Sequence, residues 1–182
     1  RHKGADFIVQ SNDVVRTAAG HPARCTDWLA GPHDVYRDMQ TKIRRLYPDG
    51  SVRHAVYFHC YLDTTLANRT RFAADMGRDA AGEAIPYGRH TYMHLFIPTL
   101  ENGWGREISR VIDVILEDIQ ADGIYWDEFA YGVPPFAFVY GRWDGVSADI
   151  DPNTFEMTRK KASTALLSRD FRVHHVKRIQ AR

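Results

Sequence analysis

Apolar residues along the chain occur in short continuous runs that alternate with stretches of helical spacing. Runs at 5–10, 54–63, 91–100 and 136–144, and the run that begins at Gly123, predict strands. The reason is that a strand covered on both faces is apolar almost throughout. We therefore expect five strands, spread over most of the chain.

Helical spacing forms the second pattern. Between 34 and 50 it predicts a helix that ends at Pro48-Asp49-Gly50. The clearest helix covers 106–119, where one face is purely aliphatic and the opposite face is largely charged; the aliphatic positions are Ile108, Val111, Ile112, Ile115 and Ile119. Residues 64–89 predict a helix broken by glycines, and residues 154–180 predict a last helix.

Strand and helix in alternation indicate parallel strands joined by crossover helices. A doubly wound sheet and a (β/α) barrel both satisfy this order. Polar residues that directly follow predicted strands favour the barrel, because barrel enzymes build their sites there; these are Asp63, Glu101, Asn102, Asp127, Glu128 and Asp144. The predicted fold class is thus α/β, a parallel (β/α) barrel, specifically a partial TIM barrel or a fragment of one.

Length decides how much of a barrel is expected. A complete barrel takes about 250 residues, whereas this chain has 182. We expect residues 1–182 to form a single α/β domain that belongs to a longer (β/α)8 catalytic domain. The chain begins Arg-His-Lys-Gly without Met, so we also expect a preceding segment.

Charge and composition narrow the classes of partner. The net charge is +1 and no long run of Lys and Arg occurs, so we expect neither nucleic acid nor membrane as a partner. No signal peptide is visible, and the compartment stays open between secreted and cytoplasmic. Cys25 and Cys60 form either one disulfide or two buried thiols, and we expect thiols.

Several chemistries lack their sequence motifs. Gly-x-Gly-x-x-Gly, Gly-Lys-Ser/Thr and His-Glu-x-x-His are absent, and Ser147 lacks the second glycine of a nucleophile elbow. We therefore expect no cofactor and no metal.

The stretch Asp-Gly-Ile-Tyr-Trp-Asp-Glu-Phe-Ala-Tyr-Gly at 122–132 leads an apolar strand into two adjacent carboxylates among aromatic rings. Burial of a charge is costly unless the charge is paired or used. Glycoside hydrolysis requires two carboxyl groups, one as acid and one as nucleophile or base. Aromatic rings beside them stack on sugar rings. The stretch therefore favours a glycosidase.

The longer segment "ILEDIQADGIYWDEFAYG" resembles the fourth-strand region of TIM-barrel glycoside hydrolases and their uncharacterised relatives. The resemblance covers about residues 54–182 and implies a barrel that acts on a carbohydrate. The chitinase-like Asp-x-x-Asp-x-Asp-x-Glu pattern is not met. Tyr125 occupies the second Asp position, and Glu128 comes one residue early.

Nine residues are candidates for the site. The catalytic candidates are Asp127, Glu128 and Asp144, and the substrate-binding candidates are Tyr131, Trp143, Glu101, Asn102, Trp104 and His59. Consecutive strand residues point to opposite faces, so we expect only one of the adjacent carboxylates to face the barrel axis. We favour Asp127, in a cleft that also receives Tyr131 and Trp143.

Each candidate has a structural alternative. Asp127 or Glu128 can cap a turn, and Asp144-Gly145 is also typical of a plain turn. The pair Glu101-Asn102 can cap the 106–119 helix, and His59 can be a core histidine.

The leading hypothesis is a glycoside hydrolase with a carbohydrate substrate. The alternatives are a non-catalytic carbohydrate-binding or structural barrel domain, and a metal-dependent barrel hydrolase that uses the scattered histidines. The sugar and the oligomeric state stay open.

Overall fold

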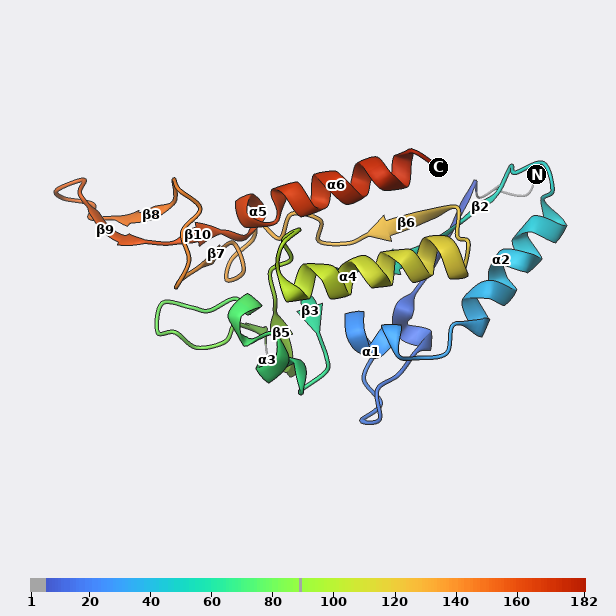
Figure 1. Cartoon of the computed structure of the whole chain (residues 1–182), viewed down its shortest axis with the longest axis horizontal. Helices are drawn as coiled ribbons and strands as arrows, with labels where there is room; N and C mark the ends of the chain where they lie inside the picture. The colour runs from blue at the N-terminus through green and yellow to red at the C-terminus, as the bar shows by residue number, and fades with distance from the viewer. Residues whose placement is uncertain (1–5, 89) are drawn as a thin grey trace.

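A computed structural model describes residues 6–88 and 90–182; residue 5 of the first predicted strand and the Arg-His-Lys-Gly start lie outside them. The centre of the fold is a parallel sheet of β1 (Phe7–Gln10), β2 (Arg53–Phe58) and β6 (Gly123–Trp126), with β2 in the middle (Figure 1). Both pairs run parallel. The predicted neighbours 54–62 and 123–128 do pair in this way.

Helices of different lengths connect and follow these strands. The longer ones are α2 (Asp34–Leu46), α4 (Gly103–Asp113) and α6 (Arg169–Gln180), and the short ones are α1 (Cys25–Leu29), α3 (Asn68–Arg71) and α5 (Thr164–Leu167). A π-helical segment, Val114–Asp118, continues α4, and 3-10 turns occupy Asn12–Val14 and Ala73–Asp75. The predicted aliphatic face of 106–119 is buried throughout, which confirms that helix.

The other described strands form antiparallel pairs. The strands β3 (Leu62–Asp63) and β4 (Pro86–Tyr87) flank β5 (His90–Leu95). Further along the chain, β7 (Phe138–Val139) pairs with β10 (Ala162–Ser163), and β8 (Ala148–Ile150) pairs with β9 (Met157–Lys160). The hairpin of β8 and β9 lies at one end of the molecule in Figure 1.

The prediction of a parallel (β/α) barrel, partial or complete, is wrong. The run at 91–100 pairs antiparallel with β3 and β4, and the run at 136–144 yields only a two-residue strand antiparallel to β10. The described residues form small separate sheets without barrel closure. After β2 the backbone bends at 60–61 and enters β3 of a second sheet instead of a crossover helix.

The last predicted helix begins later than expected. Helical structure starts at Thr164, and the residues from 154 to 163 belong mainly to the β8–β9 hairpin and β10. Asp151 ends β8 by accepting main-chain hydrogen bonds from Asn153 (2.7 Å) and Thr154 (3.1 Å). Such a local turn competes with helix formation.

The two faces of the parallel sheet differ. Val56 and Phe58 are buried, and Trp126 lies edge-on to Phe171 of α6 with ring centres 6.4 Å apart. Residues that alternate with these point the other way. On that side Phe7 is 47%, Val9 42% and Tyr125 48% exposed. Helices thus cover one face, and the other is an open face that carries apolar side chains.

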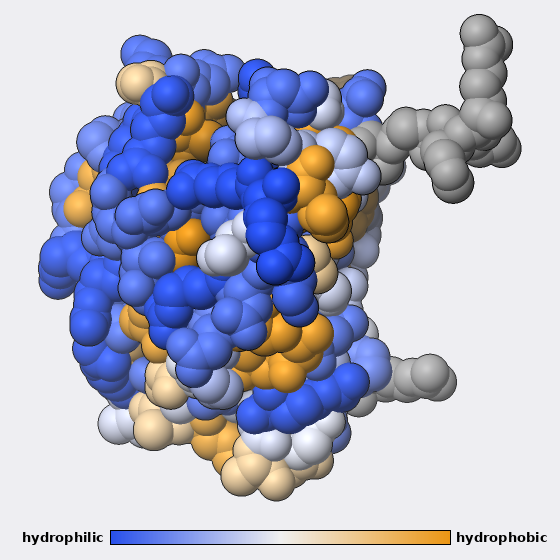
Figure 2. All heavy atoms as spheres, turned by 90° about the vertical axis from the view of Figure 1, so that its right-hand side faces the viewer, coloured by the Kyte–Doolittle hydropathy of each residue, from blue (hydrophilic) through white to orange (hydrophobic). Residues whose placement is uncertain are grey.

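Within the described residues, no helix has the length and apolar character that a membrane crossing needs. Figure 2 shows the end of the molecule that lies on the right of Figure 1, where apolar patches interrupt a largely polar surface.

Candidate functional site

Two neighbouring parallel strands bring the carboxylate pair to the end of β2. Phe58 pairs with Trp126, and the main-chain N–H of Asp127 donates to the carbonyl of Phe58 at 2.9 Å. Asp127 and Glu128 therefore lie at the carboxyl end of the sheet beside Tyr57 and His59. The carboxyl ends of parallel strands are the usual place for sites in α/β proteins.

Tyr57 holds Asp127. The Tyr57 hydroxyl donates to Oδ2 of Asp127 at 2.5 Å. Burial, together with Asp127, raises the pKa of Tyr57, so the phenol stays protonated and remains a donor. Tyr125, two residues before Asp127, lies beside Tyr57 with ring centres 5.9 Å apart. Asp127 is only partly buried, and it lies next to the open face of the sheet.

His59 holds Glu128. Its Nδ1 accepts the main-chain N–H groups of Tyr61 (3.1 Å) and Leu62 (3.3 Å). Nδ1 therefore carries no proton, and Nε2 donates to Oε2 of Glu128 at 2.5 Å. The imidazole is 2% exposed and the Glu128 side chain 29% exposed. On the other oxygen, the Tyr87 hydroxyl donates at 3.3 Å.

Backbone conformation explains why both carboxylates reach one place. Glu128 has φ 47° and Tyr131 has φ 48°, in the left-handed region that non-glycine residues seldom adopt. The strand alternation therefore stops at Asp127, and the expectation that only one carboxylate faces the site does not hold. Strained backbone of this kind tends to occur at functional sites.

Tyr131 belongs to the site but not as an exposed platform. It is 3% exposed, and its ring stacks on Tyr61 with centres 5.1 Å apart and 13° between the planes. Its edge meets His59 at 5.5 Å. The Tyr131 hydroxyl makes no hydrogen bond with the described residues.

Asp144 and Trp143 lie in a separate loop. The Asp144 carboxylate accepts from the main chain of Val146 (3.0 Å), Ser147 (2.7 Å) and Ser163 (2.6 Å), and from the Ser147 hydroxyl (2.6 Å). Burial alone would raise the pKa of Asp144, but these hydrogen bonds outweigh it and lower the pKa. Lys160 lies over the Trp143 ring at 4.1 Å. The contacts of Asp144 tie the loop together and involve neither Asp127 nor Glu128.

The candidates around the start of α4 have structural contacts. Oδ1 of Asn102 accepts from Gly105 N at 2.7 Å and caps the helix. Trp104 is fully buried and donates from Nε1 to the Cys60 carbonyl at 2.9 Å. Glu101 is exposed. The structure brings Asp127, Glu128, His59 and Tyr131 together.

Sequence inspection missed Tyr57, Tyr87 and Arg24. Tyr57 and His59 stand two apart at the end of a predicted strand, which places them on one face; this spacing was the available signal. Arg24 donates to Asn12 at 2.8 Å and pairs with Asp13 at 3.2 Å, and its guanidinium lies 5.7 Å from the centre of the Tyr57 ring. Its charge is therefore largely engaged at the carboxyl end of β1.

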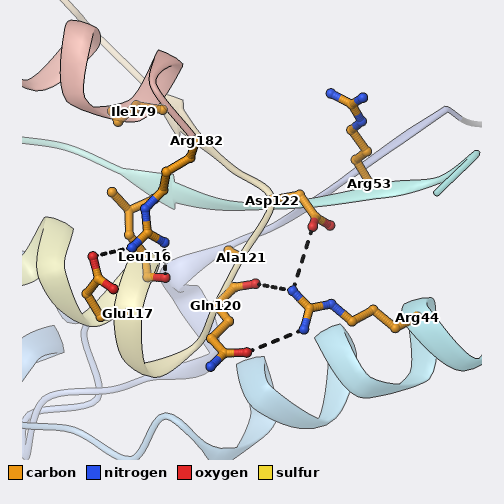
Figure 3. Close-up of a pocket in the computed structure, with 9 residues that line it drawn as sticks. All are labelled: Arg44, Arg53, Leu116, Glu117, Gln120, Ala121, Asp122, Ile179 and Arg182. Atoms are coloured by element: carbon orange, nitrogen blue, oxygen red, sulfur yellow. Dashed lines mark hydrogen bonds and ion pairs between the residues drawn. The ribbon is translucent and has the colours of Figure 1, made fainter. Parts of the chain in front are cut away.

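A hollow of about 610 Å³ lies at the opposite end of the sheet, where the strands begin (Figure 3). Arg44 donates there to the Gln120 carbonyl at 3.1 Å, and Arg182 pairs with Glu117. Figure 3 shows Arg53 pointing away from these two arginines. Because the cations do not converge on one point and carboxylates share the hollow, we place the candidate site at the carboxylate pair.

The described residues contain no group of three or more His, Cys, Asp or Glu side chains placed to hold a metal ion. Comparison of the chain with protein-family models, with curated proteins and with solved structures found no match. Function is therefore inferred from the geometry of the site.

Proposed function

We propose that the protein hydrolyses glycosidic bonds with Asp127 and Glu128. The observation that supports this is the convergence of two partly exposed carboxylates at the end of a parallel sheet, each held by a side chain of the adjoining β2 segment. Two carboxyl groups on one small surface are what this reaction requires. The proposal now stands without the barrel.

The surroundings suggest how the two carboxylates divide the work. Asp127 adjoins the open face, where the half-exposed Tyr125 ring provides an apolar surface for a sugar. We assign Asp127 as the carboxylate that acts on the anomeric carbon. Glu128, which is held by the imidazole of His59, is the second carboxyl group and acts as acid or base toward the substrate.

A panel of aryl glycosides tests the proposal. Wild type should cleave at least one of them, and Asp127→Asn and Glu128→Gln should each lower kcat by about 10³-fold or more, as expected for essential catalytic groups. Asp170→Asn is the matched control, because its side chain is 74% exposed on α6. Circular dichroism should show the same fold in all four proteins. An Asp127→Asn variant with unchanged turnover would assign Asp127 to a structural role.

The open aromatic face also supports a second candidate, carbohydrate binding without cleavage. Phe7, Val9 and Tyr125 expose apolar surface there. In that case, calorimetry would detect sugar binding that Tyr125→Ala weakens, while no glycoside is turned over.

A further inference from the structure

The Tyr131 hydroxyl is buried but makes no hydrogen bond of good geometry with the described residues. Buried hydroxyls are nearly always hydrogen-bonded, because burial without a bond is unfavourable. The stacked neighbour Tyr61 follows this rule, since its hydroxyl contacts Ser168 Oγ at 2.7 Å and the Phe129 carbonyl at 3.2 Å. The Tyr131 hydroxyl, 3% exposed as a residue, has no such contact among the described residues.

The position of this hydroxyl separates it from the other unpartnered buried atoms. Those are Arg69 Nε, Trp126 Nε1 and His175 Nδ1. Trp126 packs on the helix-covered side of the sheet, against Phe58 and Phe171. Tyr131 instead lies at the carboxylate pair. Burial first, then the charges of Glu128 and Tyr87, and then the close approach of its hydroxyl to the Glu128 side chain raise its pKa.

The backbone holds the ring in this place at a cost. Tyr131 and Glu128 both have left-handed φ values, and the N–H of Tyr131 donates to the Glu128 carbonyl at 3.2 Å. A non-glycine residue in this region is strained by about 1 to 2 kcal/mol. The strained backbone of Tyr131 and the poorly bonded hydroxyl both lower the stability of the folded chain. This arrangement therefore has no evident structural benefit.

We infer that the Tyr131 hydroxyl is a substrate-binding group, which donates to a hydroxyl oxygen of a neutral sugar held at Asp127 and Glu128. The inference rests on the proposed function and names its substrate class. Two carboxylates repel an anionic ring, and an apolar ligand would leave both carboxylates without a hydrogen-bond donor. A sugar hydroxyl suits both kinds of group, because it donates to a carboxylate and accepts from the Tyr131 hydroxyl.

Tyr131→Phe tests the inference, because it removes the hydroxyl and keeps the stacked ring. Stability to urea should be unchanged or higher, whereas kcat/KM on the best aryl glycoside should fall about tenfold, the effect of one lost hydrogen bond to substrate. Tyr36→Phe is the matched control. Tyr36 is also fully buried, but its hydroxyl contacts Trp28 Nε1 at 2.9 Å and the Ser11 carbonyl at 3.2 Å. That variant should lose stability and keep kcat/KM.

Two results would overturn the inference while the proposed function stands: full kcat/KM in Tyr131→Phe, or a loss of stability equal to that of Tyr36→Phe. If wild type binds sugar without cleaving it, the sugar dissociation constant replaces kcat/KM with the same tenfold expectation. If wild type neither cleaves nor binds any sugar in the panel, the proposed function fails, and the inference fails with it.

Discussion

At His59, both ring nitrogens are engaged. Two main-chain N–H groups donate to Nδ1, and Nε2 faces Glu128. A second proton on the ring would displace both main-chain donors, so the imidazole is held in one tautomer. The bend of the chain after β2 and the orientation of Glu128 therefore depend on the same ring.

Replacement of His59 separates these two roles. An Asn amide can place an acceptor where Nδ1 lies, whereas a Gln amide reaches the position of Nε2. We expect His59→Gln to lower the free energy of unfolding by about 1–3 kcal/mol, because two buried N–H groups lose their acceptor. His59→Asn should lose clearly less. Urea denaturation measures both.

His174, exposed on α6, provides the control. His174→Gln should change stability by less than about 0.5 kcal/mol. Equal losses in His59→Gln and His59→Asn would show that packing of the ring matters more than its Nδ1 acceptor.

At the scale of elements, the beginning of α4 depends on close contacts. A Cβ atom added at Gly105 would come within 1.8 Å of the Thr99 carbonyl oxygen, so glycine is required there. Asn102 accepts from Gly105 N and Thr99 N, and its amide donates to the Ile97 carbonyl at 2.7 Å. One side chain thus joins the end of the preceding segment to the helix.

Asn102→Ala should lower the free energy of unfolding by about 1 kcal/mol or more, the usual effect of losing an N-cap. Glu101→Ala is the neighbouring control, since the Glu101 side chain is exposed. Thermal denaturation distinguishes the two variants. If Asn102 instead contacted substrate, its replacement would leave the melting temperature unchanged and affect activity alone.

The sequence predicted the elements better than their pairing. The helix at 106–119 and the strand before Asp127 follow from local periodicity. The parallel pairing of that strand with β2 was also expected. The direction of the 91–100 run was not predictable, because an apolar strand has the same composition in parallel and antiparallel sheets. Its direction is defined only by its pairing with β3 and β4, which no local pattern specifies.

The candidate site was predictable to a similar extent. Two adjacent carboxylates after an apolar strand identify Asp127 and Glu128 without a structure. Tyr87 joins them from 41 residues away in the chain, from a two-residue strand that leaves no periodic signal. Asp144 and Trp143 have site-like composition, but their contacts are with residues 146–163 and not with the carboxylate pair.

At the scale of the whole molecule, Asp63 makes stability depend on pH. It is 2% exposed and accepts from Thr26 N (3.2 Å) and Asn68 Nδ2 (2.6 Å). Burial raises its pKa to about 6. The folded protein therefore keeps this proton at a pH where the unfolded chain has released it. As pH rises from about 4 to 6, this group should lower the free energy of unfolding by up to about 3 kcal/mol.

The measurement is the difference between wild type and Asp63→Asn, because other groups also titrate. Burial lowers the pKa of His175 to about 4, which makes stability rise with pH over much of the same range. Urea denaturation at pH 4, 5 and 6 should show that stability of the variant relative to wild type increases with pH. A constant difference would contradict the expected titration of Asp63.

The outer strands of the parallel sheet, β1 and β6, each pair on one side only within the described residues. An unpaired strand edge is a template for another chain. In concentrated solution we therefore expect molecules to associate slowly by pairing these strand edges, and dilution should suppress this association. A Lys or Pro that faces outward on β1 would block this addition at that edge, and so extend the shelf life of a stored sample.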